Sequence, residues 1–183
     1  FILKGRVSLL QGIPIIPTIG VLFGWAMPIL IAYVVESRDV SSLGLSVRRE
    51  HCWAYTLIAF IGLILPAFFV RVDTSLVIEF IEQILYIGLA EEVFNRGYLL
   101  GRLRDWLGDL KGLLLSASLF GLSHILTLVS QHGFRYPLHD LMVGSQTFIG
   151  GLLLGYVYLR TNSIVLGSII HVSTNTYLSR LLQ

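Results

Sequence analysis

The chain has 183 residues, of which 55% are hydrophobic and only 13% are charged. Soluble domains carry about 25% charged residues, so this composition excludes an ordinary soluble domain and indicates a protein that faces lipid. The net charge of +2, without a basic run, argues against a nucleic acid as partner. The single cysteine, Cys52, excludes an internal disulfide and a metal site built from several cysteines.

Long uncharged stretches predict the membrane helices, because about 20 apolar residues are needed to cross the hydrocarbon core of a bilayer. Five stretches contain no Asp, Glu, Lys or Arg, and they cover 13–35, 52–70, 112–134, 141–159 and 161–179. We expect the helix in the third of them to end near Ser130. A sixth helix is predicted over 75–100, which is equally long but carries charges, so we expect it to run through protein rather than lipid. Polar linkers are predicted at 36–51, 71–74, 101–111, 131–140 and 160–162.

The sequence therefore predicts an all-α fold, a polytopic bundle of about six transmembrane helices, with residues 1–183 forming one integral membrane domain. Two pairs of glycines, at 20 and 24 and at 151 and 155, have the small-xxx-small spacing. Such pairs let two membrane helices approach closely. We expect both pairs to lie at helix–helix contacts.

Ionisable and amide side chains inside these spans are the candidate functional residues. They are Glu91, Glu92, Arg96, His124, His171 and Asn175. A charged group at membrane depth costs several kcal/mol unless it is paired or hydrated, so such residues indicate function.

The first group lies in the helix predicted over 75–100. Glu92 and Arg96 are four residues apart, which places them on one helical face in the favourable acid-before-base order. Glu91 points about 100° away from Glu92 around the helix, so it is poorly placed for Arg96. This arrangement predicts an ion pair beside a carboxylate that is free for chemistry. The alternative is that both acids are structural and are neutralised by Arg96 and water.

The other candidates lie on later helices. His124 lies in an apolar helix and is either a catalytic group or a packed, hydrogen-bonded histidine. His171 and Asn175 are four residues apart and share a helical face. Two donors so placed suit a developing oxyanion, whereas the alternative is a polar contact that joins two helices.

Three motifs occur in order, each in a predicted membrane helix. They are E-E-x-x-x-R at Glu91, Glu92 and Arg96, F-x-x-x-H at Phe120 and His124, and H-x-x-x-N at His171 and Asn175. Together they resemble the CAAX-protease and bacteriocin-processing family of glutamic-type intramembrane endopeptidases, which includes the type II CAAX prenyl endopeptidase. The resemblance covers residues 84–182, which we expect to form the catalytic core.

The resemblance implies a role for each motif residue. Glu91 and His124 would activate the attacking water, and His171 and Asn175 would stabilise the oxyanion. Glu92 and Arg96 would support the site. It also implies that no cofactor is needed and that the partners are the lipid bilayer and a membrane-anchored protein or peptide, which is lipidated in some relatives. The compact chain fits a prokaryotic member in the cytoplasmic membrane, and some such relatives act on C-terminal sorting tails.

Three alternatives remain at the level of sequence. Glu91, His124 and His171 could bind a divalent metal such as zinc, although the H-E-x-x-H motif of zinc proteases is missing. The chain could instead be a transporter or proton relay, although no inverted repeat is visible. It could also be a non-catalytic immunity protein. Geometry separates these classes, because a protease needs its polar groups around one cavity, whereas a relay spreads them across the membrane.

Overall fold

The computed structural model describes residues 22–46, 50, 52–70 and 72–181, and these residues form helices and loops without a β-strand. The first helical rod comprises η1 (Leu22–Ala26), α2 (Met27–Leu30) and η2 (Ile31–Val35), and the short η3 (Val40–Leu43) follows. The second rod comprises α3 (Cys52–Ala59) and η5 (Phe60–Ile64), with η6 (Pro66–Phe68) after it. The predicted all-α class is therefore confirmed for the described residues.

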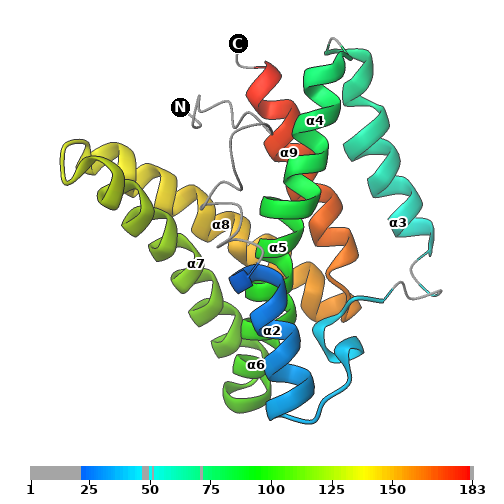
Figure 1. The fold of residues 1–183 in the computed structure, drawn as a ribbon, viewed down its shortest axis with the longest axis vertical. Helices are drawn as coiled ribbons and strands as arrows, with labels where there is room; N and C mark the ends of the chain where they lie inside the picture. Colours follow the sequence, from blue (N-terminus) through cyan, green and yellow to red (C-terminus); the bar gives the residue numbers. More distant parts are fainter. Residues whose placement is uncertain (1–21, 47–49, 51, 71, 182–183) are drawn as a thin grey trace.

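The third rod is continuous and comprises α4 (Thr74–Glu82), η7 (Gln83–Ile87), α5 (Gly88–Glu92), η8 (Val93–Leu100) and α6 (Gly101–Leu107). It is followed by α7 (Asp109–His132), α8 (Pro137–Thr161) and α9 (Val165–Leu181). In Figure 1, α4 and α9 run side by side with α3 next to them, while α7 and α8 form a hairpin that diverges from this group. The candidate catalytic residues lie on the third rod, α7 and α9.

Two helices, α7 and α8, are long and apolar enough to cross a membrane, and the apolar helices 23–35 and 52–68 are shorter. The number of six spans stays a prediction, and residues 13–21 of its first span lie outside the described residues. The distribution of side chains is inverted relative to a soluble protein. Leu122, Leu126 and Leu153 are exposed, whereas Glu92 and Arg96 are 0% and 1% exposed. This pattern suits a protein whose surroundings are lipid.

The linker predicted at 101–111 is wrong. Residues 101–107 extend the third rod as α6, and the chain turns at Gly108, with φ 82° and ψ 169°. A left-handed φ is readily adopted by glycine because it has no Cβ. The charges that indicated a linker are instead used in contacts: Arg104 pairs with Asp109 at 2.9 Å and donates to Asn162 at 2.6 Å.

Small residues mediate close helix contacts, as their spacing predicted. A Cβ added at Gly24 would lie 2.7 Å from the Cβ of Ala90, so a larger residue would push the first rod away from α5. A Cβ added at Gly151 would lie 3.2 Å from Ala117, so the glycine allows α8 to pack closely against α7. Gly20 lies outside the described residues.

An ion-pair network fastens the loop after the first rod to α6. Arg102 donates from Nε to Oε2 of Glu36 at 2.7 Å, and Arg38 donates to Asp105 at 2.8 Å. The hydrogen bond from Arg102 favours the ionised carboxylate and lowers the pKa of Glu36 below its ordinary value. The stability that this contact contributes is therefore present above the pKa of the unfolded chain and is lost as the pH falls through the lowered pKa.

Replacement of Glu36 by Gln should thus lower the free energy of unfolding by about 1 kcal/mol at pH 7, the upper end for a solvent-accessible pair. The difference from the wild-type protein should vanish in acid, where the carboxyl is protonated in both the folded and the unfolded state. Unfolding of the two proteins in detergent, followed across pH, measures this. A difference that stays constant down to pH 3 would contradict the assignment.

Candidate active site

The site is built around the buried carboxylate of Glu92. Its Oε1 lies 3.2 Å from Nη1 of Arg96, so the predicted i,i+4 ion pair is present, and 2.9 Å from Nδ1 of His171. Gly167, on α9, leaves room for this carboxylate, because a Cβ there would lie 3.0 Å from Oε2 of Glu92. The contact between Glu92 and His171 joins α5 to α9 and was not predicted from the sequence.

Arg96 also connects the third rod to α7. Its guanidinium carbon lies 4.4 Å from the centre of the Phe120 ring, which is a cation–π contact. Among the described residues, the guanidinium therefore contacts one carboxylate and one aromatic face. Phe120 also contacts both histidines edge to face, with ring centroids 4.7 Å from His124 and 6.4 Å from His171.

The contacts of His171 assign its tautomer. Oε1 of Glu92 also faces the Arg96 guanidinium, which can only donate, so this oxygen is an acceptor and Nδ1 of His171 is the donor to it. Its other nitrogen, Nε2, lies 3.8 Å from Oε2 of Glu91. The imidazole thus stands between the two carboxylates of the E-E pair.

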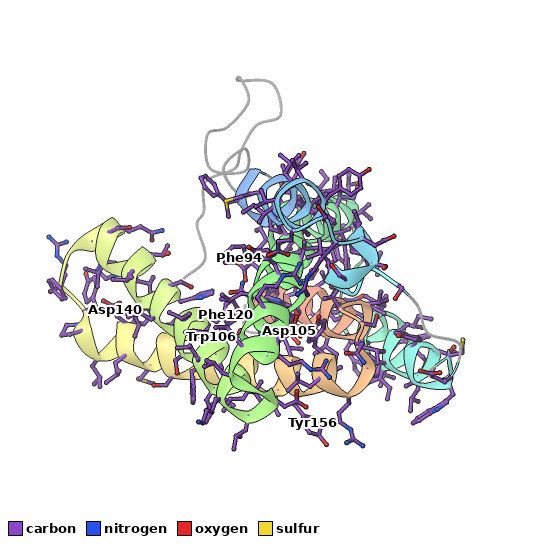
Figure 2. The ribbon with its side chains drawn as sticks, turned by 90° about the horizontal axis from the view of Figure 1, so that it is seen from below. Phe94, Asp105, Trp106, Phe120, Asp140 and Tyr156 are labelled. Atoms are coloured by element: carbon purple, nitrogen blue, oxygen red, sulfur yellow. The ribbon has the colours of Figure 1, made fainter. Side chains whose placement is uncertain are left out.

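Glu91 and His124 line one cavity of about 300 Å³ between the third rod and α7. The cavity wall also includes Phe94, Asn95 and Phe120. Figure 2 shows Phe94 and Phe120 near the junction of these helices, far from Asp140 at the outer part of the hairpin. Nδ1 of His124 lies 3.0 Å from the Phe120 carbonyl, an acceptor, so Nδ1 donates and Nε2 of a neutral imidazole keeps its lone pair.

Asn175 is not among the residues that line this cavity, and neither is His171. It is one helical turn beyond His171, and its Nδ2 donates to Oε1 of Gln83 at 3.0 Å. The structure therefore brings Glu91, Glu92, Arg96 and His171 into one contact cluster, places His124 across the cavity, and pairs Asn175 with Gln83.

Two polar residues near the site were missed at the level of sequence. Gln83 is the partner of Asn175, and Asn95 donates from Nδ2 to the backbone carbonyl of Glu91 at 2.9 Å. Neither occupies a defined position of the three motifs, so neither was among the candidates. Their position in a predicted membrane helix was the available signal, since polar amides at that depth usually have a partner.

Among the described residues, no three His, Cys, Asp or Glu side chains are arranged as a metal-binding group. In the network around Glu92, the carboxylate pairs with Arg96 and contacts His171, while Oε2 of Glu92 and Oε2 of Glu91 have no hydrogen-bond partner within the described residues. Ionisable groups that are gathered in this way beside a cavity are typical of active sites.

Comparison with known proteins identifies the family. Residues 7–177 match the family model described as type II CAAX prenyl endopeptidase Rce1-like. Comparisons with curated proteins and with solved structures gave no match. The matched region includes all three motifs and nearly the whole chain. The chain therefore belongs to the type II CAAX prenyl endopeptidase Rce1-like family, whose members are membrane-integral proteases.

Proposed function

We propose that this protein is a glutamic-type intramembrane endopeptidase that uses water to hydrolyse a peptide bond in a membrane-associated or lipidated protein. The observation that carries the proposal is the contact cluster of Glu91, Glu92, Arg96 and His171, which borders a cavity shared by Glu91 and His124. Four charged or polar groups at one junction suit hydrolysis better than a relay, which would need them spread across the membrane.

Glu91 and His124 are the bases in this proposal. Within the described chain Oε2 of Glu91 accepts no hydrogen bond, and Nε2 of His124 keeps a lone pair. A water in the cavity would give one proton to these groups as its oxygen bonds to the peptide carbonyl carbon. The proton would pass to the leaving nitrogen when the C–N bond breaks, which completes general acid–base hydrolysis without a covalent enzyme intermediate.

His171 and Asn175 would stabilise the oxyanion. Nδ1 of His171 faces Glu92, and in the imidazolium form its Nε2 would be a donor to the oxyanion. An amide nitrogen has two hydrogens, so Asn175 can donate to Gln83 and keep one for the substrate. Donors held in place before the reaction act most strongly where water is excluded.

The surroundings of the cavity support an apolar, anchored substrate. Phe94, Leu99, Leu119 and Phe120 line it beside the polar groups, so they would contact apolar side chains next to the cleaved bond. Proteins of this family act on membrane-associated protein substrates, which a lateral approach between helices would accommodate. We place the enzyme in the cytoplasmic membrane of a prokaryote, acting close to the C-terminus of its substrates.

Class-specific inhibition separates this proposal from its rival, a zinc protease with Glu91, His124 and His171 as ligands. The purified protein in detergent is given prenylated and sorting-tail peptides, and cleavage is followed by mass spectrometry. We expect activity to survive exhaustive chelation and to resist serine and cysteine reagents. Activity that is lost to a chelator and restored by zinc would replace the glutamic mechanism with the metal-dependent one.

A further inference from the structure

Gln83 is the hydrogen-bond partner of the Asn175 side chain within the described residues. Oε1 of Gln83 accepts from Nδ2 of Asn175 at 3.0 Å, and both side chains are half-buried. The two residues are 92 positions apart in sequence, so this contact is made by the packing of the third rod against α9. No motif of the sequence includes Gln83.

A local distortion of the third rod turns Gln83 towards α9. In a regular α-helix Gln83 and Glu91 would be about 80° apart, because each residue adds about 100°. The π-helical turn η7, which begins at Gln83, accommodates one extra residue and rotates the later part of the rod back by about 100°. By this count, Gln83 and Glu91 lie about 20° apart around the rod. Gln83 faces Asn175, and Glu91 faces His171, which lies one turn earlier on α9.

We propose that Gln83 is a positioning residue for the reaction, which holds the amide of Asn175 in the orientation that presents its second N–H to the substrate. Oε1 of Gln83 takes one of the two hydrogens of Nδ2 and so fixes the plane of the amide. Without this acceptor, the amide can rotate and offer its carbonyl oxygen, which would repel the oxyanion. This inference rests on the oxyanion role of Asn175 in the proposed function.

A different result is expected if the contact between Gln83 and Asn175 only joins the two helices. Polar pairs that only join membrane helices contribute to stability, and their loss would lower the melting temperature without a selective effect on turnover. If Gln83 positions Asn175, its loss should instead lower kcat more than it changes KM, because the oxyanion forms in the transition state. This effect of replacing Gln83 should also disappear in a variant that already lacks the Asn175 side chain.

A double-mutant cycle tests the proposal with the full chain in detergent and an anchored tail peptide. Asn175→Ala should lower kcat by about 10²–10³, the effect of losing one oxyanion donor. Gln83→Met, which keeps the length but removes the acceptor, should lower kcat by about 10–10² through misplacement of the amide, with KM changed less than about twofold. The double variant should be no slower than Asn175→Ala. Gln83→Glu retains an acceptor and should lie closer to the wild type than Gln83→Met.

Gln146→Met is the matched control, because Gln146 is exposed on α8, and it should leave kcat unchanged. Melting temperatures of all variants show whether they fold, and if Gln83→Met does not, the comparison is made with Gln83→Glu and Gln83→Asn. The positioning role would be overturned if the fold-decrease in kcat of the double variant were the product of the two single decreases. It would also be overturned if Gln83→Met kept the wild-type kcat while Asn175→Ala was impaired. Wild-type kcat in Asn175→Ala would instead refute the oxyanion assignment in the proposed function.

Discussion

Replacement of Glu91 by Gln should abolish turnover and leave the fold intact. The amide has nearly the shape of the carboxylate but cannot take a proton from water, so kcat should fall by about 10²–10⁴ or more, the usual contribution of a general base. The fold should tolerate the change because Glu91 is 31% exposed and its Oε2 lies 3.8 Å from Nε2 of His171, beyond hydrogen-bond distance. Peptide cleavage and thermal unfolding, measured on the same preparation, report the two effects separately.

Glu82→Gln provides the control for this variant, because it makes the same substitution in the same rod, outside the cavity wall. Its kcat and melting temperature should equal those of the wild type. Near-normal cleavage by Glu91→Gln would show that another group activates the water. A large loss of melting temperature in that variant would show that Glu91 is needed for the fold, and the loss of activity would then carry no mechanistic weight.

Replacement of Glu92 by Gln should harm both stability and activity. The variant leaves Arg96 buried at 1% exposure with the Phe120 ring but without its carboxylate. Breaking one partner of a buried ion pair typically costs about 3–5 kcal/mol. The amide oxygen of the glutamine can still accept from Nδ1 of His171, but this neutral acceptor holds the ring less strongly than the carboxylate does. Chemical unfolding in detergent and peptide cleavage measure the two losses.

A second substitution separates the two roles of Glu92. When Arg96→Met is added to Glu92→Gln, the unpaired buried cation is gone, and much of the lost stability should return. Activity should stay low, because His171 still lacks its carboxylate. Recovery of both properties would mean that Glu92 serves only to neutralise Arg96. Wild-type stability in the single variant Glu92→Gln would contradict the buried ion pair itself.

Helical periodicity explains which parts of the site could be predicted from the sequence. The spacing of Glu92 and Arg96 predicted their ion pair, and the 100° offset of Glu91 predicted that this acid would be left out of it. Both predictions hold, because the angle between two side chains within one helical turn depends only on local helix geometry. The helices predicted to carry residues 89–97 and 166–176 are also present, since local periodicity was enough to predict them.

Features that depend on tertiary contacts could not be predicted in this way. The π-helical turns η7 and η8 break the 3.6-residue period, so the faces of Gln83 and Glu91 cannot be aligned by counting residues. The contact of Glu92 with His171 spans 79 positions and requires α5 to pack against α9. The charges of α6 indicated a linker because their partners, such as Glu36 and Asn162, lie far away in the sequence.

The central claim is that water, activated beside Glu91, attacks the peptide bond directly. A single-turnover reaction of the reconstituted wild-type protein with an anchored tail peptide in ¹⁸O-labelled water, quenched at intervals and weighed by mass spectrometry, tests it most directly. We predict one ¹⁸O atom in the new carboxyl group of the product and an unchanged mass of the protein at every time point. A protein species that carries the mass of the acyl fragment, or an absence of cleavage for every anchored tail, would contradict the account.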